Sequence, residues 1–201
     1  FAMQWLLPRL PDFQAICPGI EVLISTTNRL VDLLGDGVDF AVRHGLGRYP
    51  GLEVEMLIND RLQPVCSPSL LPDSRYLSSP IDLKSYNLLH DEHREDWALW
   101  LRAVGIEDAE AAVHRGSVFV DSNGVIEAAL AGMGIALVRR SLIREELASG
   151  RLVVPFRATI DTPIAYYLVY DETAILPKSS RQFRDWLVSQ AIASQREFTT
   201  R

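Results

Sequence analysis

The spacing of hydrophobic positions changes repeatedly along the chain, between a two-residue alternation and a helical period. Apolar positions at helical spacing, bounded by capping residues and glycines, predict helices. Short alternating or β-branched runs predict strands. Helices are predicted over 2–16, 27–34, 95–105, 123–133, 141–150 and 179–195. Strands are predicted over 20–26, 38–45, 52–59, 61–67, 86–92, 117–122, 134–140, 152–156 and 165–171.

This alternation of strands and helices predicts an α/β fold with largely parallel sheets. The turn-rich stretch around 67–80 is the best candidate for a first crossover between two lobes, and 160–168 for a second. A polar stretch that runs to Arg115 separates the helix predicted over 95–105 from the strand predicted over 117–122. If both crossovers form, the chain leaves the first lobe, builds the second and returns, and the last helix packs on the first lobe.

Composition and charge narrow the class of protein. The 201 residues are 48% hydrophobic and carry a net charge of −6, so this segment lacks the basic surface of a nucleic-acid-binding protein. Arg139 and Arg140 form the only tight basic cluster, which we interpret as a solvated strand end. No apolar run reaches the roughly 18–20 residues of a membrane helix, and no signal peptide is visible. The chain starts abruptly at Phe1, which suggests a fragment.

Two cysteines complete the composition. Cys17 and Cys66 lie 49 positions apart, which matches neither a disulfide framework nor a zinc motif. We expect both to be small buried hydrophobic residues. That expectation fits a reducing, cytoplasmic setting.

Motifs for catalysis, metals and cofactors are weak. The chain has no G-x-S-x-G sequence, and no local motif pairs a cysteine with a histidine. "HDEHRED" at 90–96 offers two histidines, but a polar helix start with acidic residues is the favoured interpretation. "GLGRYPG" at 45–51 precedes a strand, whereas a dinucleotide fingerprint opens a helix. We therefore expect no catalytic residues, no metal and no cofactor.

Polar residues at strand ends are the better candidates. Ser25–Thr27, Arg43–His44 and Asp121–Asn123 each follow an apolar strand. In parallel α/β sheets, ligands bind beyond the carboxyl ends of the strands, where helix N-termini offer free N–H groups. For any one of these sets, ordinary helix capping is the favoured interpretation. Three such sets facing one cleft would favour a ligand.

The order of several segments resembles the effector-binding domain of LysR-type transcriptional regulators. The segments are "WLLPRLPDFQAICPGIEVLIST", "GVDFAVRHGLGRYPGLEVEML", "LQPVCSPSLL", "FVDSNGVIEAALAGMGIALVRRSLI", "ASGRLVVPF", "YYLVY" and "FRDWL". The similarity covers essentially the whole chain. It is greatest to the branch of the glycine-cleavage activator and the β-lactamase regulator.

The resemblance implies a type 2 periplasmic-binding-protein-like fold, with two Rossmann-like lobes joined by two crossover strands. Lobe 1 would comprise 1–67 and 168–201, and lobe 2 would comprise 68–167. A small-molecule effector, such as an amino acid or another anionic or zwitterionic metabolite, would bind in the cleft. The family's N-terminal winged helix-turn-helix, its contact with DNA, is absent from this chain. So are the first strand and the Thr/Ser-rich turn before "FA".

Carried over by position, the resemblance assigns the effector contacts. They are Thr26, Thr27, Arg43, His44, Ser67, Asp121, Ser122, Asn123 and Tyr166. It further implies a non-enzymatic, cytoplasmic homodimer or tetramer with no membrane contact. A solute-binding protein or an enzyme on the same fold remains the alternative. A signal peptide in the precursor would indicate the former, and a nucleophile–base pair in the cleft the latter.

Overall fold

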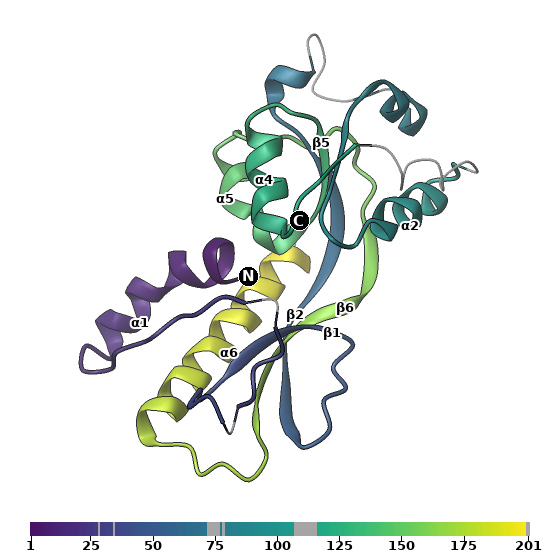
Figure 1. Ribbon diagram of the computed structural model, residues 1–201. Helices are drawn as coiled ribbons and strands as arrows, with labels where there is room; N and C mark the ends of the chain where they lie inside the picture. The colour runs from purple at the N-terminus through teal and green to yellow at the C-terminus, as the bar shows by residue number, and fades with distance from the viewer. Residues whose placement is uncertain (28, 34, 72–76, 78, 107–115, 200–201) are drawn as a thin grey trace. The chain divides into compact units, whose positions relative to one another are not determined.

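The chain forms two compact units (Figure 1). The computed structural model describes residues 1–27, 29–33, 35–71, 77, 79–106 and 116–199, so the polar stretch predicted to reach residue 115 lies largely outside the described residues. The first unit joins Phe1–Asp60 to Thr162–Arg201, and the second is the continuous segment Arg61–Asp161. The boundaries between the units therefore fall after Asp60 and after Asp161. The lobe boundaries expected from the sequence, after residues 67 and 167, lie six or seven residues later in the chain.

Two long strands carry the chain from one unit to the other. They are β2 (Leu52–Val65) and β6 (Ile160–Asp171). The sequence predicted two separate strands, 52–59 and 61–67, where β2 is continuous. Pro64 lies within β2, opposite Leu137 of its partner strand.

The first unit opens with a segmented helix. Its segments are η1 (Ala2–Leu6), η2 (Leu7–Arg9) and α1 (Leu10–Ile16). Pro8 and Pro11 lie in the first turns of η2 and α1, where a missing N–H donor is tolerated. The kink predicted from these prolines is therefore present as a division of the helix at each of them.

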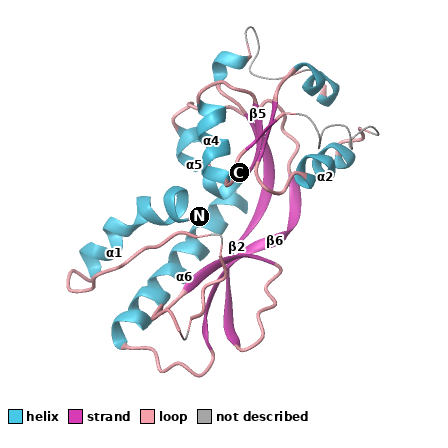
Figure 2. Cartoon of the chain, in the orientation of Figure 1, coloured by secondary structure: helices cyan, strands magenta, loops and turns pink. Residues whose placement is uncertain are grey.

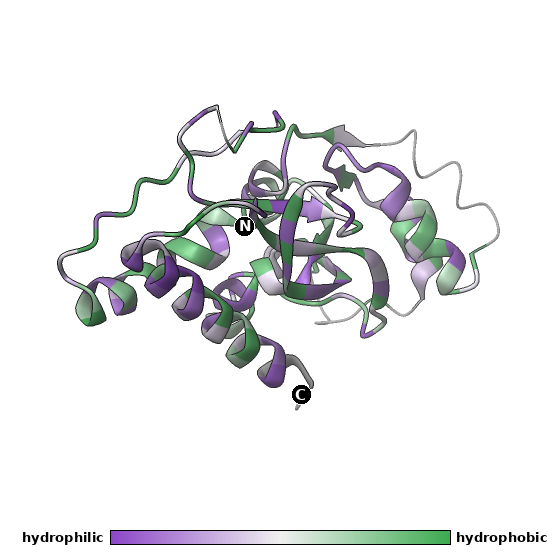
Figure 3. Ribbon diagram, turned by 90° about the horizontal axis from the view of Figure 1, so that it is seen from below, coloured by the Kyte–Doolittle hydropathy of each residue, from purple (hydrophilic) through white to green (hydrophobic). Residues whose placement is uncertain are grey.

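Aromatic rings join α1 to the closing helix α6 (Lys178–Thr199). The ring centroid of Phe13 lies 5.2 Å from that of Phe183 and 5.1 Å from that of Trp186. Hydrophobic and hydrophilic positions alternate along α6 at helical spacing (Figure 3), as expected for a helix with one buried face. The predicted packing of the last helix within the first unit is confirmed.

The segment between α1 and β1 (Ala41–Gly45) differs from the prediction. Its described residues contain neither the strand expected over 20–26 nor the helix expected over 27–34, and Figure 2 draws them as loop. Leu23 is 96% exposed. A strand needs a hydrogen-bonded neighbour as well as β-branched residues, and no described strand pairs with this segment.

The second unit packs helices around β3, β4 and β5. Figure 1 shows α4 and α5 on one side of β5 and α2 on the other. The strands are β3 (Leu88–His90), β4 (Ser117–Val118) and β5 (Ile135–Arg139). The helices are α2 (Glu95–Ala103), α4 (Ser122–Leu130), α5 (Arg144–Ala148), η3 (Pro68–Leu70), η4 (Pro80–Ser85) and η5 (Arg140–Leu142). The strand predicted over 152–156 is reduced to a single bridge between Val153 and Cys66.

Strand directions are mixed, and the prediction of largely parallel sheets is wrong in this respect. β3 runs parallel to β4 and β5, whereas β2 runs antiparallel to β5, and β1 antiparallel to β6. The order of neighbours is β1-β6-β2 in the first unit and β2-β5-β3-β4 in the second. Each antiparallel pair includes one of the two strands that cross between the units, β2 in the pair with β5 and β6 in the pair with β1. The antiparallel pairing therefore comes from these crossing strands.

Two tryptophans organise the core of the second unit. Trp97 and Trp100 of α2 are buried, and their rings meet edge to face at 6.0 Å. The indole N–H of Trp97 donates to the carbonyl of Leu89, and that of Trp100 donates to the carbonyl of Ala158. Because their polar atoms are satisfied, both rings are buried without leaving an unpaired donor.

The cysteines differ in burial. Cys66 is fully buried, as predicted, and burial raises the pKa of its thiol to about 12. Cys17 is only half-buried at the end of α1, so the prediction for it is wrong. Its sulfur accepts a long hydrogen bond from the side-chain amide of Gln182.

Candidate functional site

The N-terminus of α4 gathers three of the residues predicted to contact a ligand. Asp121 is the N-cap, and its carboxylate accepts the N–H of Gly124 at 2.9 Å. Ser122 starts the helix and donates its hydroxyl to Asp91 at 3.1 Å. The Asn123 side-chain oxygen is buried, and no described residue donates to it. Capping therefore explains Asp121, but it does not account for Asn123.

A buried ion network lies directly behind this helix start. Arg139, at the end of β5, donates to Asp91 at 3.3 Å and to Asp96 at 3.2 Å. The exposed fractions of the three side chains are 2%, 9% and 16% in that order. The prediction that Arg139 marks a solvated strand end is therefore wrong. A guanidinium buried this far needs carboxylate partners to offset its lost hydration.

The two carboxylates have different surroundings. Burial raises the pKa of Asp96, and the nearby charge of Arg139 opposes that rise. Asp91 accepts from Ser122 and Arg139 through one oxygen, and from the backbone N–H of His93 through the other. Asp91 thus ties the segment after β3 to β5 and to the first turn of α4.

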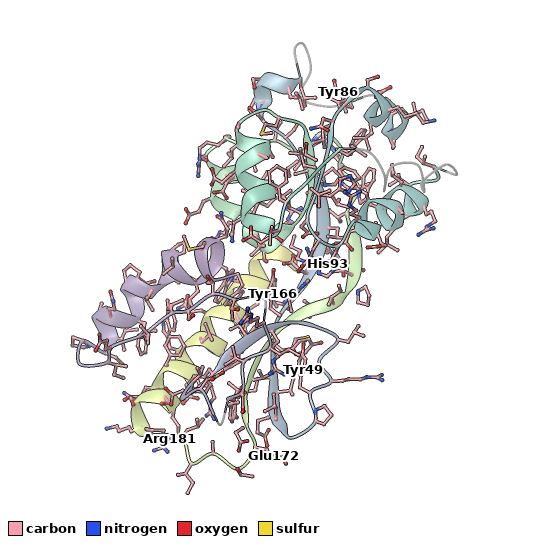
Figure 4. The ribbon with its side chains drawn as sticks, in the orientation of Figure 1. Tyr49, Tyr86, His93, Tyr166, Glu172 and Arg181 are labelled. Carbon is pink, nitrogen blue, oxygen red and sulfur yellow. The ribbon has the colours of Figure 1, made fainter. Side chains whose placement is uncertain are left out.

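In the first unit, β1 and β6 place His44 opposite Tyr166. The two residues are register partners, and their ring centroids lie 4.6 Å apart. Tyr166 also meets the ring of Phe1 at 5.2 Å, and Phe1 stacks on Trp5 at 4.9 Å. These four rings form a chain of contacts that links β1 and β6 to the start of η1. Figure 4 labels Tyr166 among them.

Arg43 lies on the other face of β1 from His44, because successive strand residues point in opposite directions. Its register partner is Tyr167, its guanidinium lies 5.0 Å from the ring centroid of Tyr49, and it donates to the carbonyl of Val31. Burial raises the pKa of Tyr49, and the charge of Arg43 opposes that rise. Arg43 and His44, predicted as one set, therefore contribute to two separate clusters.

Tyr166 and Tyr167 follow the alternation expected of neighbouring strand residues. Tyr166 is buried, whereas Tyr167 is only partly buried beside Tyr49. Of the predicted first-unit residues, the structure thus brings together only His44 and Tyr166.

The remaining predicted residues lie elsewhere. Thr26 and Thr27 are exposed in the loop, where Thr27 accepts the N–H of Arg29. Ser67 is buried against Ser69, beyond the end of β2 that pairs with the start of β5. The ion network lies at the other end of β5, so Ser67 is separated from the α4 cluster by the length of that strand.

The two-histidine segment 90–96 forms a helix start. His90 ends β3, and α2 begins at Glu95 with two acidic residues in its first turn, as the favoured interpretation predicted. Among the described residues, no group of three or more His, Cys, Asp or Glu side chains is placed to hold a metal. Over the same described residues, no helix is both long and apolar enough to cross a membrane.

The sequence prediction missed Asp91, Asp96 and Arg139. Asp91 directly follows the buried strand β3, and Arg139 ends the wholly buried strand β5. A charged residue at the end of an apolar strand is a signal that a sequence can carry. Their pairing spans 48 positions and depends on β3 and β5 being parallel neighbours, which no local sequence pattern specifies.

These features together define a class. Two α/β units and a chain that crosses between them twice are features of the type 2 periplasmic-binding-protein fold. The chain belongs to the LysR substrate binding domain family, whose model matches residues 1–192. The fold class expected from the sequence and the resemblance to LysR-type regulators are both confirmed.

Particular relatives agree with this assignment. The chain is 41% identical over its whole length to the glycine cleavage system transcriptional activator of Escherichia coli strain K12, covering 65% of it. It is 35% identical over 98% of its length to the transcriptional activator AmpR of Pseudomonas aeruginosa, covering 64%. The solved effector domain of that AmpR matches with a TM-score of 0.86 at 35% identity, over 99% of this chain and 94% of that domain. The chain thus spans just under two thirds of the curated relatives.

Proposed function

We propose that this chain is the effector-sensing and oligomerising module of a bacterial LysR-type transcriptional regulator that acts in the cytoplasm. The observation that carries the proposal is the α4 start, where a buried ion network fixes Ser122 and where no described residue donates to the buried oxygen of Asn123. A preorganised polar cluster of this kind binds a small ligand with little loss of side-chain entropy. The relatives' printed names, transcriptional activators, support the regulatory role.

The effector contacts are proposed separately for the two units. In the second unit they are Asp121, Ser122 and Asn123, and in the first unit His44 and Tyr166. The ligand is proposed to be a small zwitterion or anion, with amino acids first because one relative is named for glycine cleavage. Binding would shift the populations of conformations, and a dimer or tetramer would pass that shift to DNA-binding domains outside this chain.

The test is calorimetric titration of the domain with amino acids, purines and cell-wall peptides. For a compound that binds, Ser122→Ala and Tyr166→Phe should each weaken affinity about tenfold or more, since each loses one hydrogen bond to a charged or polar ligand group. Asp161→Ala is the matched control, because its carboxylate is 78% exposed and pairs with an exposed residue, Arg61. Unchanged affinity in both site variants would contradict the site.

A coupling measurement asks whether one ligand uses both clusters. If Ser122 and Tyr166 contact the same molecule, the loss of binding free energy in the double variant should differ from the sum of the losses in the two single variants. Strict additivity would assign the two clusters to independent roles. The alternative of a solute-binding protein or an enzyme is not favoured, because the relatives are transcriptional regulators.

A further inference from the structure

We infer that the buried pair Asp91–Arg139 sets the hydrogen-bond polarity of Ser122, so that the side chains at the α4 start select an effector group that donates, namely a protonated amine. Asp91 and Arg139 are positioning residues in this scheme, because they act through Ser122. The inference rests on the proposed function and adds the chemistry that the site would recognise.

The first step concerns the one proton of the Ser122 hydroxyl. A serine hydroxyl has a single proton to donate and two lone pairs that accept. Its described partner is the Asp91 oxygen at 3.1 Å, and that oxygen also accepts from Arg139 at 3.3 Å. A carboxylate ion-paired to a guanidinium can only accept. The hydroxyl proton is therefore committed to Asp91, and toward a ligand Ser122 can only accept.

The second step concerns the neighbouring side chains. One carboxylate oxygen of Asp121 takes the N–H of Gly124, which leaves further lone pairs exposed to solvent. The Asn123 side-chain oxygen is a buried acceptor that no described residue satisfies. Asp121 and Ser122 thus offer oxygen acceptors at the start of α4, while the buried Asn123 oxygen is an acceptor without a donor among the described residues. An ammonium group, with three donors and a positive charge, satisfies such a set better than a carboxylate or a neutral ether does.

The third step concerns how the orientation is held. Asp91 is fixed from both oxygens, since its other oxygen accepts the N–H of His93 at 2.9 Å. Arg139 is anchored in turn by Asp96 at 3.2 Å. Because Arg139 and Asp91 are almost fully buried, water does not compete for their bonds. The network therefore behaves as a rigid support for the Ser122 hydroxyl rather than as a second binding site.

A ligand-free NMR measurement tests the orientation directly. In protein labelled with ¹³C-serine, the Ser122 hydroxyl proton should exchange slowly enough to be seen, with Ser122→Ala supplying its assignment. Asp91→Ala should abolish that signal. This variant leaves Arg139 paired with Asp96, so no buried charge loses its only partner. A Ser122 hydroxyl proton that exchanges as fast as in free serine, in the unsubstituted domain, would overturn the inference whether or not the variant folds.

A selectivity measurement tests the consequence. The probes are the twenty amino acids, each paired with the carboxylic acid that lacks the amine. The amine should improve affinity by about tenfold or more, and Asp91→Ala should reduce that preference to about threefold or less. Asp96→Asn is the matched control. It removes one charge from the network, but the asparagine side-chain oxygen can still accept from Arg139, so the anchor of Arg139 is kept and the preference should be kept as well.

The outcomes separate the inference from the proposed function. If Asp96→Asn lowers the preference for the amine as much as Asp91→Ala does, the electrostatic field of the buried charges, and not the Ser122 hydroxyl, selects the amine. That result would overturn the inference. Amine-free acids that bind as tightly as the amino acids would also overturn it, while leaving effector binding intact. If no probe binds, the NMR result alone decides. Failure of the proposed function would instead show as affinity that Ser122→Ala and Tyr166→Phe leave unchanged.

Discussion

Replacing Arg139 by methionine isolates the energetic role of the buried ion network. Methionine keeps most of the arginine volume, so the change removes the charge and its hydrogen bonds more than the packing. It leaves Asp91 and Asp96, whose side chains are 9% and 16% exposed, as neighbouring buried carboxylates without their cation. Breaking a buried pair in this way destabilises proteins by about 3–5 kcal/mol. We expect a loss of that size in the free energy of unfolding at neutral pH.

The loss should depend on pH, and the direction follows from Asp96. Burial raises the pKa of this carboxyl, and Arg139 opposes the rise, so the variant should have a still higher Asp96 pKa. A carboxyl whose pKa is higher in the folded than in the unfolded state favours folding below its unfolded pKa. That contribution is lost as the pH rises through the folded pKa. Between pH 7 and pH 5 the destabilisation should therefore shrink by about 1–2 kcal/mol.

The assay is urea unfolding followed by circular dichroism, with hydrogen exchange of β5 and α2 to locate the loss in the second unit. Adding Asp91→Asn and Asp96→Asn to Arg139→Met should recover about half of the loss or more, because the unpaired charges are removed. A destabilisation below about 1 kcal/mol, or one that is the same at pH 5 and pH 7, would refute this account of the network.

Two further predictions concern close packing and thiol chemistry. Gly116→Ala should destabilise the fold by about 3 kcal/mol or more, because a Cβ would lie 1.8 Å from the carbonyl oxygen of Leu88 at a φ of +98°. Gly150→Ala, at a φ of +72° with nothing within 4 Å, should cost only about 1 kcal/mol; similar melting temperatures for the two variants would contradict this. At pH 8, a thiol reagent should label half-buried Cys17 but not Cys66, whose pKa is about 12, until urea is added. Rapid labelling of both cysteines in the native protein, measured by mass spectrometry, would show that Cys66 is accessible.

The elements that were predictable from the sequence are those whose signals are local. The helix over 123–133 was recognisable from its capping residues and small apolar face, and α4 occupies Ser122–Leu130. Asp121, Ser122 and Asn123 were identified for the same reason, since N-cap chemistry depends on adjacent residues. Strand alternation alone requires that one of Tyr166 and Tyr167 be more buried than the other, but it does not say which, and in the structure the buried ring is that of Tyr166.

The features that escaped prediction depend on partners distant in the chain. Residues 20–26 have strong strand propensity, but propensity does not supply a hydrogen-bonded neighbour. Arg139 looked like the end of a solvated strand because its carboxylates lie 48 and 43 positions away. Arg43 and His44 are neighbours in the sequence, but strand alternation places their side chains on opposite faces of β1, so a shared strand end does not put them in one cluster.

The division of the chain has a consequence for synthesis on the ribosome. The second unit is one uninterrupted segment, Arg61–Asp161, so it can fold as soon as it has emerged. The first unit cannot, because Phe13 packs on Phe183 and Trp186, which are made only after the whole second unit. Translation adds about 5–20 residues per second, so the apolar face of α1 stays exposed for on the order of ten to thirty seconds before the residues that bury it are made. Slower translation would lengthen the exposure of this face of α1 in the nascent chain.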